Sequence, residues 1–434
     1  MKSLISNKVF YKRHDMELAR YLVSGSSLHL INEKSRNKVS AQSSNVIYLD
    51  LNVSIEHQIQ DLVPKKFDTI VVSDIFEVND ELIKFLKSIS SLLNHDGKLI
   101  LTSINTKWKF ALKFLELINA KQKTDQFSYI HTSKLDSLIT GSGFGLVSTT
   151  TRQYFPFKFF YIGSFINRFF EIIFFNFHLG IKTYITLRKN IILESSYSRS
   201  IIIPAKNEEG NLNELVDRIP KSKKTELILS IGKSKDNTLQ LAKQIQKNNN
   251  YFKIKVIEQT KNGKANAVWE AIDISQGEII AILDSDLSVD PEELDNFFEI
   301  IEKNHADFVN GTRLIYEMEK GSMRYINKVG NRIFQYLIGK IINEPITDSL
   351  CGTKVFKKNL IENIKWWQKN YKLTDPFGDF DLLFVASYSG AKIAEYPIHY
   401  RARKYGTTQI SRFKDGYKLI KYLVRSFIII NTTK

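Results

Sequence analysis

Two aspartates at the end of an apolar run are the clearest chemical signal in this 434-residue sequence. Ile279–Leu283 predicts a short buried strand, and Asp284 and Asp286 follow it directly. Because side chains of an extended chain alternate, both carboxylates leave the strand end on one side. Two like charges this close need a cation, and paired hard oxygens suit Mg²⁺ or Mn²⁺ with a diphosphate. The alternative is a plain turn that leads into a helix at Pro291.

The chain around this pair alternates strands with helices, which predicts a parallel sheet flanked by helices. In such sheets ligands bind at the carboxyl ends of the strands, and the unusual polar residues of this region all lie at those ends. We expect strands over Ser200–Pro204, Glu226–Ile231, Ile254–Gln259 and Glu278–Leu283, with helices that end at Ile219 and that cover Ser234–Gln246 and Gly263–Ser275.

Short motifs recur along the second half of the chain, from residue 199 to about 425. They are Ile-Ile-Ile-Pro-Ala-Lys-Asn-Glu-Glu (201–209), Gly-Lys-Ala-Asn-Ala (263–267), Asp-Ser-Asp (284–286), Asn-Gly-Thr-Arg (310–313), Asp-Ser-Leu-Cys-Gly-Thr-Lys (348–354), Phe-Gly-Asp-Phe-Asp (377–381) and Tyr-Arg-Ala-Arg (400–403). In order and spacing they resemble family 2 glycosyltransferases of the GT-A nucleotide-diphospho-sugar transferase fold. The resemblance is nearest to the branch that transfers sugars to dolichyl or other polyprenyl phosphates.

This resemblance implies a donor site for a nucleotide-diphosphate sugar. The residues expected to line it are Pro204, Asn207, Glu208, Gly263, Lys264, Asp284, Arg401 and Arg403. Asn207 and Glu208 would contact base and ribose, although the same residues could simply cap a helix. Backbone donors and the cation of Lys264 suit a diphosphate, and Asp284 with Asp286 would hold Mg²⁺ or Mn²⁺.

One position departs from the family pattern. Relatives usually carry an acid at the end of the second strand, whereas this sequence has Ile231 or Gly232 there, followed by the matching Ser234 and Asp236. The usual acidic contact to the nucleotide is therefore missing. This leaves the nucleotide open and keeps a weakened or non-catalytic protein among the alternatives.

The acceptor side is expected from the later motifs. Arg313 and Arg324 match arginines near the lipid phosphate, where guanidinium forks suit a dianion. A hydroxyl acceptor would instead need a general base, for which Asp379 and Asp381 are the candidates and Asp348 an outsider. Each of these aspartates could equally cap a helix or pair with a lysine.

The resemblance thus implies an inverting, metal-dependent transferase that moves a sugar to a polyprenyl (dolichyl or undecaprenyl) phosphate. Two alternatives stay open. One is a transferase that extends a cell-surface glycan at a hydroxyl, and the other is a non-catalytic scaffold with decayed sites. Cys351 is expected to be a packed small residue, because no activating partner is recognisable in sequence.

The first part of the chain also alternates strands and helices. Phe67–Asp74, a helix over Asn79–Leu93 and the run Leu92–Leu101 resemble the second half of a class I S-adenosylmethionine-dependent methyltransferase. No glycine stands in Leu28–Ser35, where such enzymes carry their cofactor loop. We therefore expect two parallel-sheet α/β domains. The first, residues 1–192, is an incomplete methyltransferase-like Rossmann fold not expected to bind S-adenosylmethionine. Residues 193–198 form a linker, and 199–434 the glycosyltransferase domain.

The composition of the chain limits which classes of binding partner are expected. A net charge of +16 calls for an anionic partner, but a nucleic-acid binder would not explain the ordered carboxylates. One cysteine and no evident signal peptide favour a cytoplasmic protein. The aromatic stretch Tyr154–Leu187 is too often interrupted to span a bilayer. It either lies in a membrane interface or is buried, and the basic helix expected over Arg412–Arg425 fits an anionic membrane surface or an ordinary solvated face.

Overall fold

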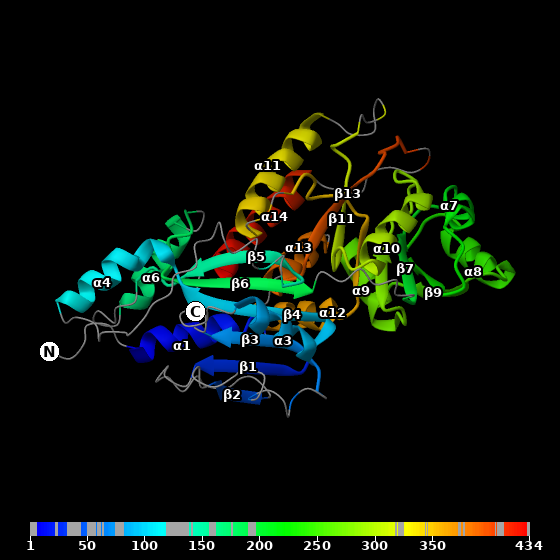
Figure 1. Cartoon of the computed structure of the whole chain (residues 1–434). Helices are drawn as coiled ribbons and strands as arrows, with labels where there is room; N and C mark the ends of the chain where they lie inside the picture. The colour runs from blue at the N-terminus through cyan, green and yellow to red at the C-terminus, as the bar shows by residue number, and fades with distance from the viewer. Residues whose placement is uncertain are drawn as a thin grey trace. The chain divides into compact units, whose positions relative to one another are not determined.

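A computed structural model describes residues 7–21, 25–32, 45–49, 58, 62, 65–73, 82–118, 139, 142–155, 162–174, 177–189, 197–316, 319, 325–342, 344, 346–371, 375, 378–403, 405 and 412–431. The chain divides into two compact units, and Figure 1 shows a sheet in each. Unit 1 is Met1–Ile191 with Ile428–Lys434, and unit 2 is Ile192–Phe427. Most of the linker predicted over residues 193–198 lies outside the described residues.

Unit 1 contains a six-stranded sheet in the order β2-β1-β3-β4-β6-β5. Its strands are β1 (Ser27–Asn32), β2 (Asn45–Leu49), β3 (Phe67–Ser73), β4 (Leu93–Ile104), β5 (Phe144–Arg152) and β6 (Lys182–Lys189). β2, β1, β3 and β4 run parallel, but β6 is antiparallel to both β4 and β5. The expectation of a purely parallel sheet is therefore wrong at this edge, where β6 comes from the end of the aromatic stretch.

Unit 1 also contains several helices, of which α3 packs its apolar side against the sheet. They are α1 (Asn7–Leu18), α3 (Leu82–Leu92), the 3₁₀ turn η3 (Thr106–Trp108), α4 (Lys109–Leu117) and α6 (Gly163–Phe174). In α3 the side chains of Phe85, Leu86 and Ile89 are buried in the main core of the unit. The helix predicted over Asn79–Leu93 is confirmed over Leu82–Leu92.

The aromatic stretch predicted as one segment is divided in two. Its middle forms helix α6, and its end, from Lys182, forms strand β6 inside the sheet. The buried alternative is confirmed for β6, which is almost completely buried, whereas α6 keeps large aromatic side chains exposed. The membrane-interface alternative stays a prediction. Residues 156–161 and 175–176 of the stretch lie outside the described residues.

Unit 2 is built on a seven-stranded sheet in the order β13-β11-β12-β10-β7-β8-β9. Its strands are β7 (Arg199–Ala205), β8 (Thr225–Ile231), β9 (Lys253–Glu258), β10 (Ile279–Ile282), β11 (Phe308–Thr312), β12 (Lys354–Lys357) and β13 (Ile393–Pro397). The four predicted strands are β7 to β10, and they are parallel. The sheet as a whole is mixed, because β12 enters antiparallel between β10 and β11. The purely parallel prediction is again too simple.

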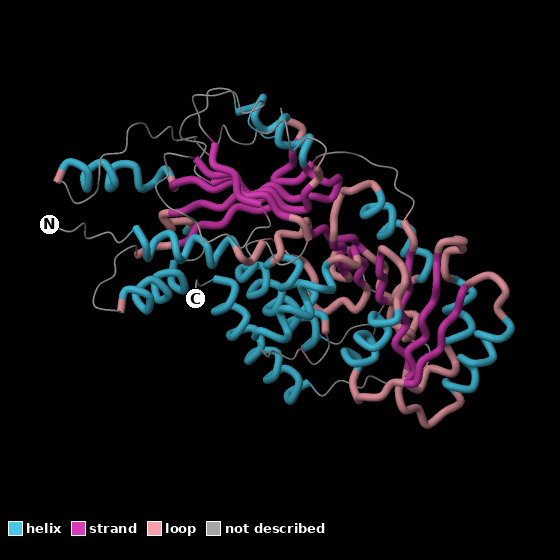
Figure 2. The backbone as a smooth tube through the Cα atoms, turned by 90° about the horizontal axis from the view of Figure 1, so that it is seen from below, coloured by secondary structure: helices cyan, strands magenta, loops and turns pink. Residues whose placement is uncertain are grey.

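Helices lie on both sides of the strands of unit 2 in Figure 2. They are α7 (Leu212–Arg218), α8 (Thr238–Asn248), α9 (Lys264–Ile274), the 3₁₀ turn η6 (Pro291–Glu293), α10 (Leu294–Glu302), α11 (Tyr325–Ile342), α12 (Leu360–Tyr371), α13 (Asp379–Tyr388) and α14 (Arg412–Asn431). β10 is buried along its whole length, as its uninterrupted apolar sequence predicts. None of the helices formed by the described residues is long and apolar enough to cross a membrane.

Candidate active site

The Asp-Ser-Asp loop begins where β10 ends and is held against the end of β7. The two strands pair in parallel, and the amide of Leu283 donates to the carbonyl of Ile202 at 3.0 Å. One step further on, the Ser285 hydroxyl donates to the carbonyl of Pro204, also at 3.0 Å. Pro204, predicted to line the donor pocket, therefore lies beside the two carboxylates at the carboxyl edge of the sheet.

Asp284 is paired with the first residue of helix α9. Lys264 places its Nζ 2.5 Å from Asp284 Oδ1, directly after Gly263, whose φ of 105° favours glycine. Burial alone would lower the pKa of Lys264, but the carboxylates of Asp284 and Asp379 outweigh it and raise that pKa. Gly352 packs against this pair, and a Cβ there would lie 2.1 Å from Asp284 Oδ2. This close approach requires glycine.

Asp286 is paired with the other predicted cation. Arg403 Nη2 lies 2.6 Å from Asp286 Oδ2, and the backbone amide and hydroxyl of Ser288 donate to Asp286 Oδ1 at 3.0 and 2.5 Å. Asp286 is almost fully buried, whereas Asp284 is partly open. The two predicted metal ligands thus each hold one basic side chain at the same edge.

The donor set fits a divalent cation only together with a ligand. Among the described residues, no group of three or more histidine, cysteine, aspartate or glutamate side chains is arranged to hold a metal. Asp284 and Asp286 offer two carboxylates, and Mg²⁺ commonly uses one or two carboxylates with substrate phosphates and water. Asp284 and Asp286 are the residues that would hold such a cation, with Lys264 and Arg403 as the basic side chains beside it.

The segment with Arg401 and Arg403 lies along the Asp-Ser-Asp loop. Tyr400 forms an isolated antiparallel bridge with Val289, and the amide of Arg401 donates to the carbonyl of Ser288 at 2.9 Å. The Arg401 side chain binds Asp290 at 2.7 Å. Arg401 is therefore neutralised by its own partner, and Arg403 is the arginine of this segment that meets a predicted metal ligand.

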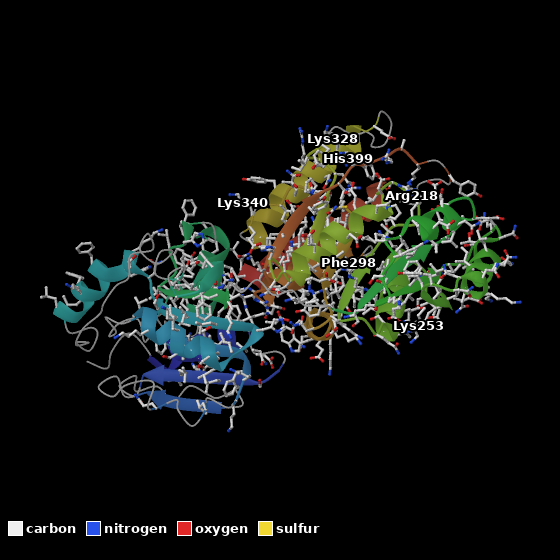
Figure 3. The ribbon with its side chains drawn as sticks, turned by 45° about the vertical axis from the view of Figure 1, so that its right-hand side comes forward. Arg218, Lys253, Phe298, Lys328, Lys340 and His399 are labelled. Atoms are coloured by element: carbon white, nitrogen blue, oxygen red, sulfur yellow. The ribbon has the colours of Figure 1, made fainter. Side chains whose placement is uncertain are left out.

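Two further basic side chains border this loop. Arg218, labelled in Figure 3, extends from the end of α7 and binds Asp290 at 2.6 Å and Glu292 at 2.8 Å. His399 stacks on Tyr316 with the ring centroids 4.4 Å apart.

The predicted nucleotide residues Asn207 and Glu208 lie in the loop after β7. Asn207 has a positive φ of 57°, donates its amide to Ser234 Oγ at 3.1 Å and accepts from the amide of Lys235 at 2.7 Å. The amide of Glu208 donates to Thr238 Oγ1 at 2.9 Å. These hydrogen bonds join the loop after β7 to the loop after β8. Ser234, which matches the family pattern, accepts one of them.

Gln259 and Lys206 pack closely against Gly232, one of the two positions where the family pattern has an acid. A Cβ on Gly232 would lie 3.0 Å from Gln259 Oε1 and 3.3 Å from Lys206 Cβ. Gln259 in turn donates to the carbonyl of Gly263 at 2.6 Å. This end of the site therefore presents an amide and an exposed lysine where the family pattern has a carboxylate.

Glu208 is a buried carboxyl at the centre of the site. Burial raises its pKa to about 7, against a hydrogen bond from Asn211 at 2.6 Å. The negative charge of Asp286 raises it further, and Arg403 opposes this. Near neutral pH this side chain is partly protonated, and it can then donate as well as accept a hydrogen bond.

Replacing Glu208 with glutamine should change how stability depends on pH. The unfolded chain releases this proton near pH 4.5, but the folded chain holds it until about pH 7. Stability should therefore fall as the pH rises between these values, by up to about 3 kcal/mol. Glu208→Gln should remove this fall, which urea unfolding at pH 4.5 to 8 would measure. The same change at exposed Glu258 is the control, and an unchanged slope in Glu208→Gln would contradict the assignment.

Asp379 and Asp381, both predicted as candidate bases, face different surroundings on α13. Asp379 Oδ1 lies 3.2 Å from Nζ of the buried Lys354, and its charge acts on Lys264 in the site. Asp381 is buried away from them, where Tyr422 and Gln368 donate to its two oxygens. Only Asp379 is therefore placed with the Lys264–Asp284 pair, and Asp381 binds α14 and α12.

Arg313 is also engaged by a buried partner. Its guanidinium donates to both oxygens of Asp348 at 2.6 and 2.9 Å, and it lies over the Tyr400 ring at 5.0 Å. The Arg313 charge and hydrogen bonds from Arg313 and Asn331 overcome burial and lower the pKa of Asp348 to about 2. The predicted phosphate contact of Arg313 would require this pair to open. Arg324 lies outside the described residues.

Sequence reasoning gave no role to two residues that bind site residues. Lys354 ends the motif at 348–354, is the first residue of β12 and is fully buried. A lysine at the start of an apolar strand is the sequence feature that could have indicated its role. Asn331 donates to Asp348 at 2.7 Å from within α11, and no local pattern marks it. Cys351 is buried as expected, and burial raises its pKa to about 11.

This strand edge carries two carboxylates, each paired with a basic side chain, and these are the group types that suit a phosphorylated ligand with a divalent ion. The family follows from comparison with known proteins. Residues 200–365 match the family model of "Glycosyl transferase family 2". Unit 2 therefore contains a glycosyltransferase family 2 domain, and the predicted enzyme class is confirmed.

Curated relatives match about half of the chain. A low-salt glycan biosynthesis hexosyltransferase of Haloferax volcanii is 24% identical over 52% of this chain and 52% of its own length. A dodecaprenyl-phosphate galacturonate synthase of Rhizobium johnstonii is 25% identical over 49% and 62%, respectively. A dolichol-phosphate mannosyltransferase of Pyrococcus furiosus is 25% identical over 52% and 62%. The chain thus spans about half to three fifths of the length of these relatives.

Among solved structures, glucosyl-3-phosphoglycerate synthase of Mycobacterium tuberculosis, in complex with Mn²⁺, uridine diphosphate and phosphoglyceric acid, is 17% identical with a TM-score of 0.41. That match covers 54% of this chain and 79% of the other. Residues 1–349 of S. aureus TarS with uridine diphosphate give 20% identity and a TM-score of 0.37 over 53% and 65%. Both TM-scores are low, and they do not establish a common fold.

Proposed function

We propose that unit 2 is an inverting glycosyltransferase of the GT-A type that moves a sugar from a nucleotide-diphosphate sugar to a polyprenyl phosphate. The observation that carries the proposal is the pairing of Asp284 with Lys264 and of Asp286 with Arg403 at one strand edge. The family match supports sugar transfer. Two of the relatives described above are named for transfer to dodecaprenyl or dolichol phosphate, which supports the acceptor.

The donor would be bound by residues already brought together. In this proposal Asn207, Glu208 and Lys206 would contact the nucleotide, while Lys264 and Arg403 would be the cations for the diphosphate. Asp284 and Asp286 would hold Mg²⁺ or Mn²⁺, which when bound neutralises charge on the diphosphate. In direct displacement the acceptor oxygen forms its bond to the anomeric carbon as the bond to the diphosphate breaks, and a nucleoside diphosphate leaves.

The acceptor chemistry decides whether a base is needed. A phosphate acceptor is already anionic at neutral pH, whereas a hydroxyl must lose a proton during attack. Of the two candidate bases, the proposal gives this role to Asp379, which lies near Lys264 of the Lys264–Asp284 pair and binds Lys354. Extension of a glycan at a hydroxyl is the second candidate, which the Haloferax hexosyltransferase, named for glycan biosynthesis, supports.

Asp379→Asn should therefore separate the two acceptors. With a polyprenyl phosphate the rate should fall by less than about tenfold, and with a hydroxyl acceptor by about 10² to 10⁴. Initial rates across pH 6 to 9 would measure this, and Asp273→Asn on the exposed side of α9 is the matched control. A loss above about a hundredfold with a phosphate acceptor would contradict the proposed chemistry.

The proposal itself is tested by transfer from a panel of labelled nucleotide sugars into lipid-extractable product. The full chain is supplied with polyprenyl phosphate in detergent and with Mg²⁺ or Mn²⁺. We expect product with one donor, lost on chelation and in Asp286→Asn. Product only with a glycan acceptor would favour the second candidate. No product and no nucleotide-sugar binding would favour a non-catalytic scaffold.

For unit 1 we propose a methyltransferase-like domain that no longer binds S-adenosylmethionine. The parallel order β2-β1-β3-β4 beside an antiparallel pair supports the fold, and the described strand β1 carries no glycine at its end. Calorimetric binding of S-adenosylmethionine to the chain would contradict this.

A further inference from the structure

Helix α6 of unit 1 turns its polar side inward. Asn167 and Glu171, one turn apart, are buried. Asn167 accepts the amide of Phe155 at 3.0 Å, and Glu171 accepts the amide of Gln153 at 3.2 Å. Ser164 accepts from Arg13 at 3.0 Å. These hydrogen bonds fix the rotation of the helix, because a turned helix would leave the polar groups unpaired.

The opposite side of α6 is apolar and exposed. Phe165, Phe169 and Ile173 follow each other at a spacing of four, and Phe165 is 74% exposed. An amphipathic helix on a soluble domain normally buries such a side. An exposed apolar side of this kind is typical of a surface that binds another protein or a membrane.

Helix α4 adds to the same surface. β4 ends at Ile104 opposite Lys182, and Lys182 also pairs with the end of β5, so α4 and α6 both leave this end of the sheet. Figure 1 shows both helices there. Trp108, just before α4, donates to the carbonyl of Leu179, just after α6, at 2.6 Å. We name the exposed apolar side chains of the two helices the α4–α6 surface; they are Phe110, Phe114 and Leu117 on α4 and Phe165, Phe169 and Ile173 on α6.

Charge indicates the occupant. Lys107, Lys113 and Arg168 are exposed beside these apolar side chains. The sequences of α4 and α6 contain two acids, of which Glu171 is buried and Glu116 lies outside the described side chains. Cations around a phenylalanine-rich helical surface are complementary to anionic lipid headgroups above acyl chains. The whole chain carries a net charge of +16, which adds long-range attraction.

We propose that the α4–α6 surface of unit 1 docks the protein onto an anionic phospholipid bilayer, with the phenylalanines in the acyl boundary and the cations at the phosphates. Vesicle binding requires no sugar transfer, so the inference stands independently of the proposed function. It gives unit 1 a role that neither cofactor binding nor methyl transfer supplies.

The test is sedimentation of the full chain with sucrose-loaded vesicles of phosphatidylcholine, with and without phosphatidylglycerol. We expect binding to the anionic vesicles that weakens with salt. Phe165→Ser with Phe169→Ser should lower the partition coefficient by about tenfold or more. Lys113→Glu with Arg168→Glu should lower it mainly at low salt. Exposed Tyr251→Ser with Ile274→Ser, in unit 2, is the matched control and should bind as the parent does.

Several outcomes would overturn the proposal. One is a parent chain that does not bind anionic vesicles, and another is a Phe165→Ser, Phe169→Ser variant that binds them as well as the parent. Binding lost only in Ile333→Ser with Tyr336→Ser would place the contact on α11 of unit 2 instead. Light scattering could show that the parent is a dimer and that the Phe165→Ser, Phe169→Ser variant is a monomer that does not bind vesicles. That result would assign the surface to contact with a second copy of the chain. Because the changed side chains are exposed, each variant is expected to fold.

Discussion

Asp286→Asn should abolish most sugar transfer, with a fall of at least about a hundredfold at saturating donor. The change keeps the size of the side chain, and the amide oxygen can still accept from Ser288, so the loop geometry should persist. What is lost is the negative charge that pairs with Arg403 and that would hold the divalent ion. The measurement is the initial rate of transfer as a function of Mg²⁺ and Mn²⁺ concentration.

Two readouts separate the loss of the metal site from general damage. Asp295→Asn, which alters an exposed surface pair with Arg199, is the matched control and should transfer at the parent rate. In the absence of metal, the nucleoside diphosphate should bind Asp286→Asn at least as well as the parent, because Arg403 is released for the phosphates. Activity within about threefold of the parent would exclude Asp286 from the metal site.

The carboxylate pair could be predicted because its causes are local. A short apolar run predicts β10, which ends at Ile282, and Asp284 and Asp286 follow in the loop at its carboxyl end. The expected alternation of an extended chain does not reach them, because Ser285 and Asp286 form a turn. Asp379 and Asp381 are also two residues apart, but their side chains point to different surroundings because both residues are on helix α13. Residues two apart on a helix face different ways, so one aspartate faces Lys354 and the other Tyr422. Assigning both as candidate bases overlooked this difference in period.

The remaining differences are long-range. The antiparallel entry of β12 between β10 and β11, and the pairing of Arg403 with Asp286, join segments far apart in the sequence. No periodicity or motif spacing encodes such contacts. The orientation of α6 is a further case, because an apolar stripe marks two sides of a helix without stating which faces inward. Here the hydrogen bonds to Asn167 and Glu171 decide it.

Asp348→Ala should destabilise unit 2 by about 3 to 5 kcal/mol. Asp348 is fully buried and accepts from the side chain and amide of Arg313, and from Asn331. Its loss would leave a mostly buried guanidinium without its counter-charge, which costs far more than an exposed pair. Urea unfolding followed by tryptophan fluorescence would measure this, since Trp269, Trp366 and Trp367 all lie in unit 2.

A double change distinguishes a lost pair from a lost cavity. Arg313→Met with Asp348→Leu removes both charges and should recover most of the stability lost in Asp348→Ala, because no buried charge is left unpaired. The pKa of Asp348 is lowered to about 2, so its stabilisation is complete above pH 3.8 and is lost as the pH falls toward 2. The parent and Asp348→Ala should therefore converge in acid. If Asp348→Ala unfolds like the parent at pH 7 but transfers no sugar, then Asp348 positions Arg313 for the reaction rather than for the stability of the fold.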